Sequence, residues 1–312
     1  MKRLIKLIYW RCITILFFVL HPKRFFEKTC IVMVDGGMAS QMRQYLLGCA
    51  VAKASGIKVK YDLSWFERCG MDILGQESRS YVLEKIFPSA HVERAGKLET
   101  YVYRNVFWTS LADPNVYDPN VLISKKNRYL GGYYRNKQYI YNVRDIEREI
   151  FTFNVSLCDE NTALLDKILS EKNSVAVHMR RGDFIGSVHD CTNEKYFQQA
   201  MDLLSAKTIN PLFFIFSNDI DWAKKTFAHR KVVYFLEAND IDQGYFDMYL
   251  MSRCKHFIIS NSWFGVWAAR LGADSEKIVI CPHTFFRDDP EGEHLYDIVD
   301  EDWINIKCDL SK

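Results

Sequence analysis

Two adjacent arginines, Arg180 and Arg181, come just after an apolar run, Ser174 to Val177, that has the composition of a buried strand. The guanidinium groups are planar, always charged and suited to phosphate oxygens. Gly182 allows a sharp turn, and Asp183 can orient an arginine or bind a hydroxyl. An adjacent arginine pair can also be a surface salt-bridge cluster, but its place after a buried strand favours a binding site.

A second polar group, Ser260-Asn261-Ser262, follows the predicted strand from Phe257 to Ile259 and opens a predicted helix. Serine and asparagine are preferred helix N-caps, and a helix N-terminus attracts anions. The triplet alone is better explained by an ordinary capped helix. Together with the arginine pair it predicts a clamp for a diphosphate.

A third strand-to-helix turn is formed by Asp35-Gly36-Gly37, followed by Gln41 and Gln44. It lacks the G-x-G-x-x-G spacing of dinucleotide sites. The two glycines would let a ligand approach the backbone closely, and a tight loop without a ligand is the alternative.

Asp247 begins a helix-like run one helix before the Ser-Asn-Ser turn. Its carboxylate could accept hydrogen bonds from guanine N1 and N2. The alternative is a solvated acid in a first helical turn, where the helix dipole favours it.

Metal binding is not predicted. Pairs of the D-x-D type occur at Asp219/Asp221, Asp240/Asp242 and Asp300/Asp302, a number that chance explains. No His/Cys cluster has zinc spacing. Two arginines and a helix N-terminus could neutralise a diphosphate instead.

Strands alternate with helices in two stretches of the chain, which predicts parallel sheets covered by helices. The first stretch has strands from Ile31 to Val34 and Ile57 to Tyr61 around a helix over 38–54 that stops at Gly56. The second has strands starting near 174, 212, 232, 257 and 278, with helices over 193–205, 221–228, 244–254 and 263–271. We therefore predict an α/β fold with two Rossmann-like domains, 30–160 and 161–312, and ligands at the carboxyl ends of the strands, often between domains.

Composition excludes one class of partner. The 312 residues carry 41 basic and 39 acidic side chains, a net charge of +2, and a nucleic-acid-binding protein needs a larger basic excess. The nine cysteines form no C-x-x-C pair, which predicts reduced thiols and a cytoplasmic location.

The segment 1–29 combines an apolar run, Ile13 to Leu20, with basic residues on both sides. The run is much shorter than the roughly 20 residues of a membrane-spanning helix. Residues 1–24 could form a helix on an anionic membrane surface, or a helix packed on the body of the protein.

Several of these segments together resemble the α-1,2-fucosyltransferases of glycosyltransferase family 11. HMRRGDF at 178–184 is similar to the family's H-x-R-R-G-D motif, and DGGMASQMRQYLLGCAVA at 35–52 to its GGLGNQMFQYA segment. YLGGYY at 129–134, FSND at 216–219 and DMYLMSRCKHFIISNSWFGVWAARL at 247–271 also match. The chain departs from the family at Ala39-Ser40, Arg43 and Val266. Its size resembles the bacterial branch, which builds surface polysaccharide.

The resemblance implies a GT-B-like fold, GDP-fucose as donor substrate, inversion at the anomeric carbon, and neither metal nor cofactor. Arg180 would bind the β-phosphate, with Arg181 paired to Asp183 or the phosphates. His178 and Asp247 would contact the guanosine. Other expected donor-site residues are Gly36, Gly37, Gln41, Ser260, Asn261, Ser262 and Phe264.

The expected reaction moves L-fucose to the 2-hydroxyl of a terminal galactose in a surface oligosaccharide, on a free or lipid-linked acceptor. Arg180, Asp183 and Asp190 are the expected catalytic residues. Asp183, His189 and Asp190 are candidate general bases. Two alternatives stay open: another nucleotide-sugar transferase of similar fold, or a non-catalytic glycan- or nucleotide-binding protein at the membrane.

Overall fold

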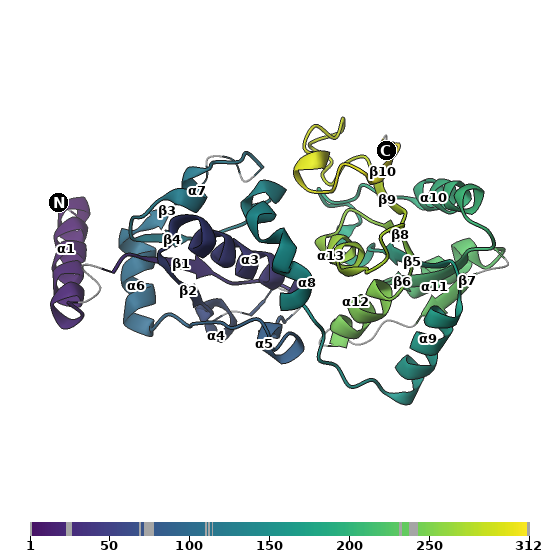
Figure 1. Ribbon diagram of the computed structural model, residues 1–312. Helices are drawn as coiled ribbons and strands as arrows, with labels where there is room; N and C mark the ends of the chain where they lie inside the picture. The colour runs from purple at the N-terminus through teal and green to yellow at the C-terminus, as the bar shows by residue number, and fades with distance from the viewer. Residues whose placement is uncertain are drawn as a thin grey trace. The chain divides into compact units, whose positions relative to one another are not determined.

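The computed structural model describes residues 2–22, 27–68, 70–71, 78–109, 111, 113, 115–230, 233–236 and 243–310. The chain divides into two compact units, Met1–Asn154 and Val155–Lys312, here called the N-terminal and C-terminal units. Each contains a parallel sheet with helices, so the predicted α/β fold with two Rossmann-like units is confirmed (Figure 1). The predicted boundary after residue 160 would cut through helix α9 (Asp159–Ser170).

The N-terminal unit is built on a parallel sheet of order β2-β1-β4-β3. Its strands are β1 (Thr29–Met33), β2 (Lys58–Asp62), β3 (Trp108–Thr109) and β4 (Arg128–Leu130). The sequence pattern did not indicate β3 and β4, because each is too short to show a period. Helix α3 (Met38–Ser55) joins β1 to β2 and ends at Gly56, whose φ of 71° is left-handed, as predicted.

Helices cover both faces of this sheet. On one face Tyr45 of α3 stacks on Tyr61 of β2, with ring centroids 5.3 Å apart. On the other, Val102 and Tyr103 of α6 (Lys97–Val106) pack with Ile31 of β1 in one buried cluster. Shorter helices fill the connections: α4 (Ser64–Arg68), α5 (Leu83–Ile86), α7 (Asn120–Ile123), η1 (Lys137–Ile146) and α8 (Glu147–Ile150).

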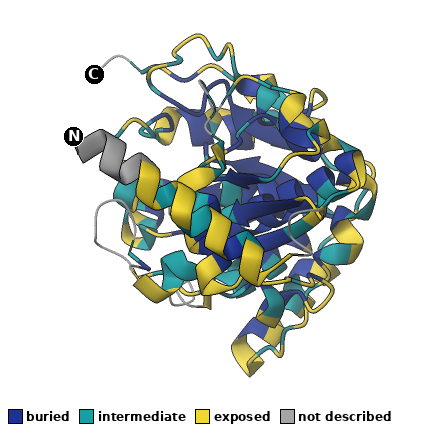
Figure 2. Cartoon of the chain, turned by 90° about the vertical axis from the view of Figure 1, so that its left-hand side faces the viewer, coloured by how far each residue is buried: buried dark blue, intermediate teal, exposed yellow. Residues whose placement is uncertain are grey.

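The first helix, α1 (Lys2–Leu20), lies on the outer side of α6. Phe17 is 2% exposed and belongs to the same cluster as Val102 and Tyr103. One face of α1 is therefore packed on the body of the protein. The opposite face is exposed, and Figure 2 draws the exposed parts of this helix in yellow. Its exposed apolar residues include Ile8, Ile15, Leu16, Val19 and Leu20. Among the described residues no helix has the length and apolar character needed to cross a membrane.

The C-terminal unit contains a parallel sheet of order β10-β9-β8-β5-β6-β7. Its strands are β5 (Ser174–Met179), β6 (Leu212–Ser217), β7 (Val233–Leu236), β8 (His256–Ile259), β9 (Val279–Pro282) and β10 (Ile304–Ile306). All but β10 lie where the sequence predicts them, with ends shifted by one or two residues. Because β5 continues to Met179, His178 belongs to the strand.

Helices α10 (Glu194–Lys207) and α11 (Ile220–Phe227) pack on one face of this sheet, with Val175 and Val177 of β5 in the shared core. Helix α13 (Trp263–Leu271) packs against α12 (Gly244–Ser252) and β8. Its Phe264 stacks on His178, which alternates with Val177 along β5 and so faces the other side of the sheet. Short 3-10 turns, η2 (Gly182–Phe184) and η4 (Leu295–Asp297), complete the unit.

Both sheets reverse their strand order beside their first strand. In the C-terminal unit the chain builds β5, β6 and β7 outwards and returns to place β8 on the other side of β5. In the N-terminal unit the same reversal lies between the neighbouring strands β1 and β4. Open α/β sheets bind ligands outside the carboxyl ends of strands at such switch points. The loops after β5 and β8, and those after β1 and β4, are therefore the places to examine for a site.

Candidate active site

Ser260 ties together the loops after β5 and β8. Its backbone N–H donates to the carbonyl of His178 at 3.0 Å. Its hydroxyl accepts from the Arg180 N–H at 3.2 Å and is hydrogen-bonded to His178 Nδ1 at 3.1 Å. Ser260 is fully buried. These hydrogen bonds fix the main chain at Arg180, and contact of Ser260 with the donor stays a prediction.

Asn261 also serves the local fold. Its side-chain amide donates to the carbonyls of His189 at 2.8 Å and Phe285 at 3.0 Å, and the residue is 3% exposed. The Asn261 amide nitrogen thus joins two loops, and contact of Asn261 with the donor stays a prediction. Ser262 is half-buried and caps α13, where its hydroxyl accepts from the Phe264 N–H at 3.3 Å. Of Ser260, Asn261 and Ser262, only Ser262, at the start of α13, is partly exposed.

His178 is buried against α13. Its ring stacks on Phe264 with centroids 5.4 Å apart. Burial, and secondly the charge of Arg180, lowers the pKa of His178 to about 3. The imidazole is therefore neutral at physiological pH. Contact of His178 with a guanosine stays a prediction.

The buried His178 predicts a pH-dependent stability. In the unfolded chain this imidazole has a pKa near 6.5 and in the folded chain about 3. The unfolded state therefore binds more protons between these values. Stability is fully present above pH 6.5 and falls as the pH drops, by about 1.4 kcal/mol per unit below pH ~6. We expect His178→Asn, whose side-chain amide keeps a polar atom near the position of Nδ1, to lack this pH-dependent part of the stability.

Urea unfolding of wild type and His178→Asn at pH 7, 6 and 5 measures this contribution. The difference in free energy of unfolding between the two proteins should shrink as the pH falls. An unchanged difference over this range would show that His178 takes up a proton in the folded state.

The two arginines after β5 have different partners. Arg180 Nε lies 2.8 Å from Asp183 Oδ1, because the η2 turn brings Asp183 back over it. Arg181 Nε donates to Asp219 at 3.2 Å, and its guanidinium lies 3.7 Å from the centroid of the Trp222 ring. The predicted pairing of Arg181 with Asp183 is therefore wrong. Arg181 is held on α11, and Arg180 lies beside the loop that joins β8 to α13.

Gly182 allows the close contact between this turn and the loop after β6. A Cβ atom at Gly182 would lie 2.5 Å from Asn218 Nδ2. The other end of that amide, Asn218 Oδ1, accepts from the Arg181 N–H at 2.8 Å. The glycine is required here for space, and the turn that carries both arginines depends on it.

The candidate general bases are built into the loop that follows. Asp190 accepts from the Gly186 N–H at 3.0 Å, and its main-chain carbonyl accepts from Arg287 at 3.1 Å. The His189 ring has Phe184 and Phe286 as neighbours, with centroids 5.0 and 5.3 Å away. Asp183 is the partner of Arg180. These contacts give each group a role in holding the loop, and their catalytic role stays a prediction.

The remaining predicted residues lie elsewhere. Asp247 is half-buried in the first turn of α12. Gly36, Gly37 and Gln41 belong to the N-terminal unit. Gln41 is fully buried: its amide nitrogen donates to the carbonyls of Gly36 at 3.1 Å and Ser80 at 2.9 Å, and its oxygen accepts from the Val82 N–H at 3.0 Å. The Gln41 amide therefore supports the loop after β1, and its contact with the donor stays a prediction.

One of the carboxylates with metal-ligand spacing has another function in the structure. Asp219 caps α11 through the Trp222 N–H at 3.3 Å and pairs with Arg181. Asp240 and Asp242 lie outside the described residues. Within the described part of the chain, no group of three His, Cys, Asp or Glu side chains is arranged to hold a metal ion.

The sequence analysis did not include the end of β6 among the site residues. Ser217 accepts from the Asp219 N–H and donates to the Met179 carbonyl, each at 3.0 Å, and Asn218 and Asp219 bind Arg181. The signal was present: three polar residues follow the apolar run LFFIF. They stand beside β5, since β5 pairs with β6.

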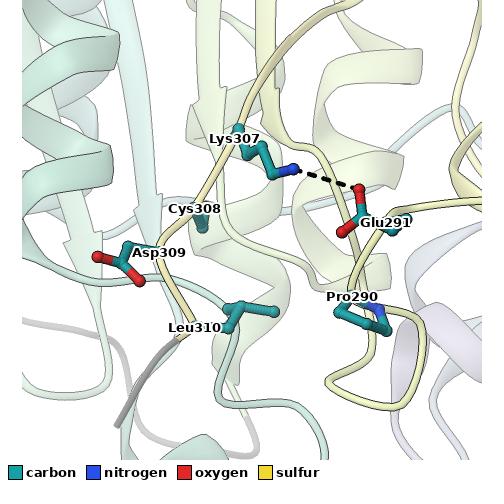
Figure 3. A pocket seen from close by; sticks show the side chains of 6 residues that line it. All are labelled: Pro290, Glu291, Lys307, Cys308, Asp309 and Leu310. Atoms are coloured by element: carbon teal, nitrogen blue, oxygen red, sulfur yellow. Dashed lines mark hydrogen bonds and ion pairs between the residues drawn. The ribbon is translucent and has the colours of Figure 1, made fainter.

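A surface hollow of about 360 Å³ follows the edge strand β10 (Figure 3). Lys307 and Glu291 form an exposed ion pair across it at 3.2 Å. Strands β9 and β8 lie between β10 and β5, so this hollow is separate from the arginine turn.

An arginine, a neutral buried histidine and a capped helix start thus meet at one switch point of an α/β unit, an arrangement of the kind that suits an anion. The sequence pattern of the family described as Glycosyl transferase family 11 matches residues 110–307. The chain belongs to this family.

Relatives with known names agree with that assignment. The chain is 29% identical over 298 residues to an alpha-1,2-colitosyltransferase of Escherichia coli, covering 89% of this chain and 98% of the relative. It is also 29% identical over 196 residues to the O-antigen biosynthesis glycosyltransferase WbnK of Escherichia coli, covering 60% of this chain and 64% of that protein. Among solved structures it is similar to the fucosyltransferase NodZ from Bradyrhizobium, with a TM-score of 0.48, 14% identity, and coverage of 78% and 92% of the two chains.

Proposed function

We propose that this protein is an inverting, metal-independent fucosyltransferase that moves L-fucose from GDP-fucose to the 2-hydroxyl of a terminal galactose in a surface oligosaccharide. The observation that carries the proposal is Arg180, fixed by Ser260 and Asp183 beside the start of α13, in a chain of glycosyl transferase family 11. An always-charged guanidinium and a helix N-terminus are together suited to a diphosphate.

The reaction breaks the bond between the anomeric carbon of fucose and a phosphate oxygen. Negative charge grows on the departing GDP, and preorganised donors at that point give the largest stabilisation. Arg180 supplies a charged donor, and the N-terminus of α13 supplies the positive end of a helix dipole. Arg181 is occupied by Asp219 and Trp222, so its part is to hold the turn. The acceptor oxygen attacks from the opposite face of the sugar, which inverts the anomeric centre.

The donor sugar has one close alternative. The relative that covers nearly the whole chain is named a colitosyltransferase, and colitose is fucose without its 3-hydroxyl. Both sugars would present the same GDP to the arginine turn, so the shared part of the proposal is a GDP-activated 6-deoxy sugar. A comparison of kcat/KM for GDP-fucose and GDP-colitose decides between them, and we expect GDP-fucose to be preferred.

Nucleotide binding tests the donor site without an acceptor. Calorimetric titration should show GDP binding at least tenfold more tightly than UDP or ADP, with the same affinity in the presence of EDTA. Equal affinity for the three nucleotides would favour another nucleotide-sugar transferase. Affinity or transfer that disappears with EDTA and returns with manganese would contradict the metal-free mechanism and make the D-x-D pairs candidates again.

We further propose that the protein works in the cytoplasm at the membrane surface, where a lipid-linked acceptor would be found. The support is the exposed apolar stripe of α1, in which Ile15, Leu16 and Val19 are each more than half exposed. A stripe of this kind beside basic residues suits an anionic membrane surface. Removal of residues 1–24 is a poor test, because the loss of Phe17 would also expose the cluster on α6.

The triple variant Ile15→Ser/Leu16→Ser/Val19→Ser tests the stripe without disturbing the packed face. We expect co-sedimentation with anionic vesicles to fall at least fivefold, while the melting temperature and activity on a soluble oligosaccharide stay close to wild type. Unchanged vesicle binding would contradict a membrane role for this face.

A further inference from the structure

A tryptophan of the N-terminal unit is exposed, which is unusual for this residue type. Trp108 opens β3, the edge strand of the N-terminal sheet, and is 48% exposed. Tryptophan is highly buried on average, because its ring is large and mostly apolar. An indole with about half of its surface in water at a sheet edge therefore has either a ligand or a structural function.

The indole ring lies flat against strand β4. It stacks on Tyr129, with ring centroids 5.2 Å apart and an angle of 22° between the planes. Gly131 follows on the same side of the chain, and a Cβ atom there would lie 2.2 Å from the indole. The absence of a side chain at Gly131 thus makes room for the ring. One face of the indole is covered by Tyr129, and the remaining surface is open to solvent.

The support beneath the ring is rigid. Tyr129 is fully buried. Its hydroxyl donates to Asp62 Oδ2 at 2.5 Å and accepts from Arg104 Nε at 3.2 Å. Arg104 Nη2 donates in turn to Asp62 and to Ser64 Oγ, the latter at 2.9 Å. The position of the indole is therefore set before any ligand binds, and such preorganisation lowers the entropic cost of binding.

A guanidinium group lies beside the indole. Arg104 Cζ is 5.6 Å from the centroid of the Tyr129 ring, so Arg104 and Trp108 lie against the same buried ring. The Arg104 side chain is 25% exposed, and its Nη1 atom makes no hydrogen bond to the described part of the chain. This nitrogen is the donor that remains for a ligand at this surface.

The charge of this guanidinium is balanced by a buried acid. Burial raises the pKa of the Asp62 carboxyl. Hydrogen bonds from Tyr129 and Ser64, and then the charge of Arg104, lower this pKa by more. Asp62 is therefore ionised at neutral pH and is ion-paired with Arg104. A phosphate would gain little from this pair, since the two charges cancel, whereas a neutral ligand with hydroxyl groups would fit.

Pyranose rings have the shape and polarity that such a surface requires. Galactose has an axial 4-hydroxyl, which leaves several C–H bonds together on the opposite face of the ring. That apolar face can pack on an aromatic side chain while hydroxyl groups at its rim accept hydrogen bonds from a guanidinium.

We propose that Trp108 and Arg104 form a carbohydrate-binding site on the N-terminal unit, in which a galactose ring stacks on the indole and one of its hydroxyls accepts from the guanidinium. The choice of galactose rests on the proposed function. The binding itself uses residues of the N-terminal unit alone and needs no nucleotide, so it can be measured apart from sugar transfer.

The structural alternative is that the indole only covers a glycine. Aromatic rings can stabilise an edge of a sheet by packing over a glycine of the neighbouring strand. In that case the loss of Trp108 would lower the melting temperature and leave the affinity for sugars unchanged.

The indole N–H signal of Trp108 reports binding directly by NMR. The full chain with isotope-labelled tryptophan is titrated with methyl β-galactoside in the absence of nucleotide, and Trp108→Phe identifies the signal by its absence. We expect this signal to shift until it saturates. Saturation transfer should be strongest to the sugar protons on the face opposite the axial hydroxyl, and GDP alone should leave the signal in place.

Variants connect the affinity to the indole. Trp108→Ala should weaken binding of the galactoside about fivefold or more. Gly131→Ala should weaken it similarly, because the added methyl group displaces the ring that the variant keeps. The matched control is Tyr141→Ala, which removes a more exposed aromatic ring of the same unit and should leave the affinity unchanged.

Unchanged affinity in Trp108→Ala would overturn the inference, whether or not the melting temperature falls. A Trp108 signal that does not respond to the galactoside in wild type would overturn it too, and a shift with GDP instead would indicate a nucleotide site. If Trp108→Ala does not fold, Gly131→Ala decides by the same comparison of affinities. Failure of wild type to transfer sugar, while the Trp108 signal responds to the galactoside, would refute the proposed function alone.

Discussion

Replacing Arg180 with alanine is expected to lower kcat/KM for GDP-fucose about 100- to 1,000-fold, the typical cost of removing one transition-state donor. Arg180 is fixed by the hydrogen bond of its N–H to Ser260 and by the ion pair with Asp183. The side chain is about one quarter exposed, so its loss should leave the fold intact. Steady-state kinetics with a thermal melt measure both quantities.

Two further variants make this result specific. Arg180→Lys should recover little activity, since an ammonium cannot make the bidentate contact of a guanidinium. Arg230→Ala removes an arginine of similar exposure in the same unit that pairs with Asp202 at 2.9 Å, and it should leave kcat/KM unchanged. Near-native turnover of Arg180→Ala would mean that the phosphate site lies elsewhere.

The second large effect is expected from Gly182→Ala. The added methyl group would lie 2.5 Å from Asn218 Nδ2. Asn218 cannot turn aside without breaking its hydrogen bond to the Arg181 N–H, so the turn that carries both arginines must shift. A displacement of about 1 Å in a catalytic group can cost about 100-fold in rate. We expect a loss of that order in kcat/KM, with a melting temperature within a few degrees of wild type.

The steric cause can be tested separately. Gly182→Ala combined with Asn218→Ala removes the obstacle and should recover part of the lost activity. Gly244→Ala is the matched control, because nothing lies within 4 Å of a Cβ at the start of α12. If Gly182→Ala alone is fully active, the turn is more adaptable than its contacts indicate, and the positioning of Arg180 does not depend on it.

The strand and helix pattern of the C-terminal unit could be predicted from sequence, because its strands are continuous apolar runs that end in polar groups. The run Ser174 to Val177 followed by two arginines is an example, and so is the apolar run before Ser260. These patterns place the motifs at the carboxyl ends of neighbouring strands. In the N-terminal unit, β3 and β4 are too short for any periodic signal.

The partners of individual side chains could not be predicted in the same way. Sequence spacing did not show that Arg180, and not Arg181, pairs with Asp183, because that depends on the direction of the η2 turn. It also did not show that Ser260, Asn261 and Gln41 each make hydrogen bonds that hold neighbouring loops in place. These residues are polar and next to glycines or strand ends, so in sequence they look the same as ligand groups.

The N-terminal helix shows a third limit. The sequence offered membrane binding and packing on the body as alternatives, whereas α1 packs through Phe17 and keeps an apolar stripe exposed on its other side. Which face of α1 is covered depends on its contact with α6, and this contact cannot be predicted from the sequence of α1 alone.

The central claim, transfer of fucose to a galactose 2-hydroxyl, is tested most directly by the product itself. Purified protein is incubated with GDP-fucose and an oligosaccharide that ends in galactose, and the product is examined by mass spectrometry and NMR. We expect the mass of one added fucose and an α-1,2 linkage to the terminal galactose, with GDP released in equal amount. A product with another sugar linkage, or no transfer to any galactoside while GDP-fucose is bound, would contradict the account.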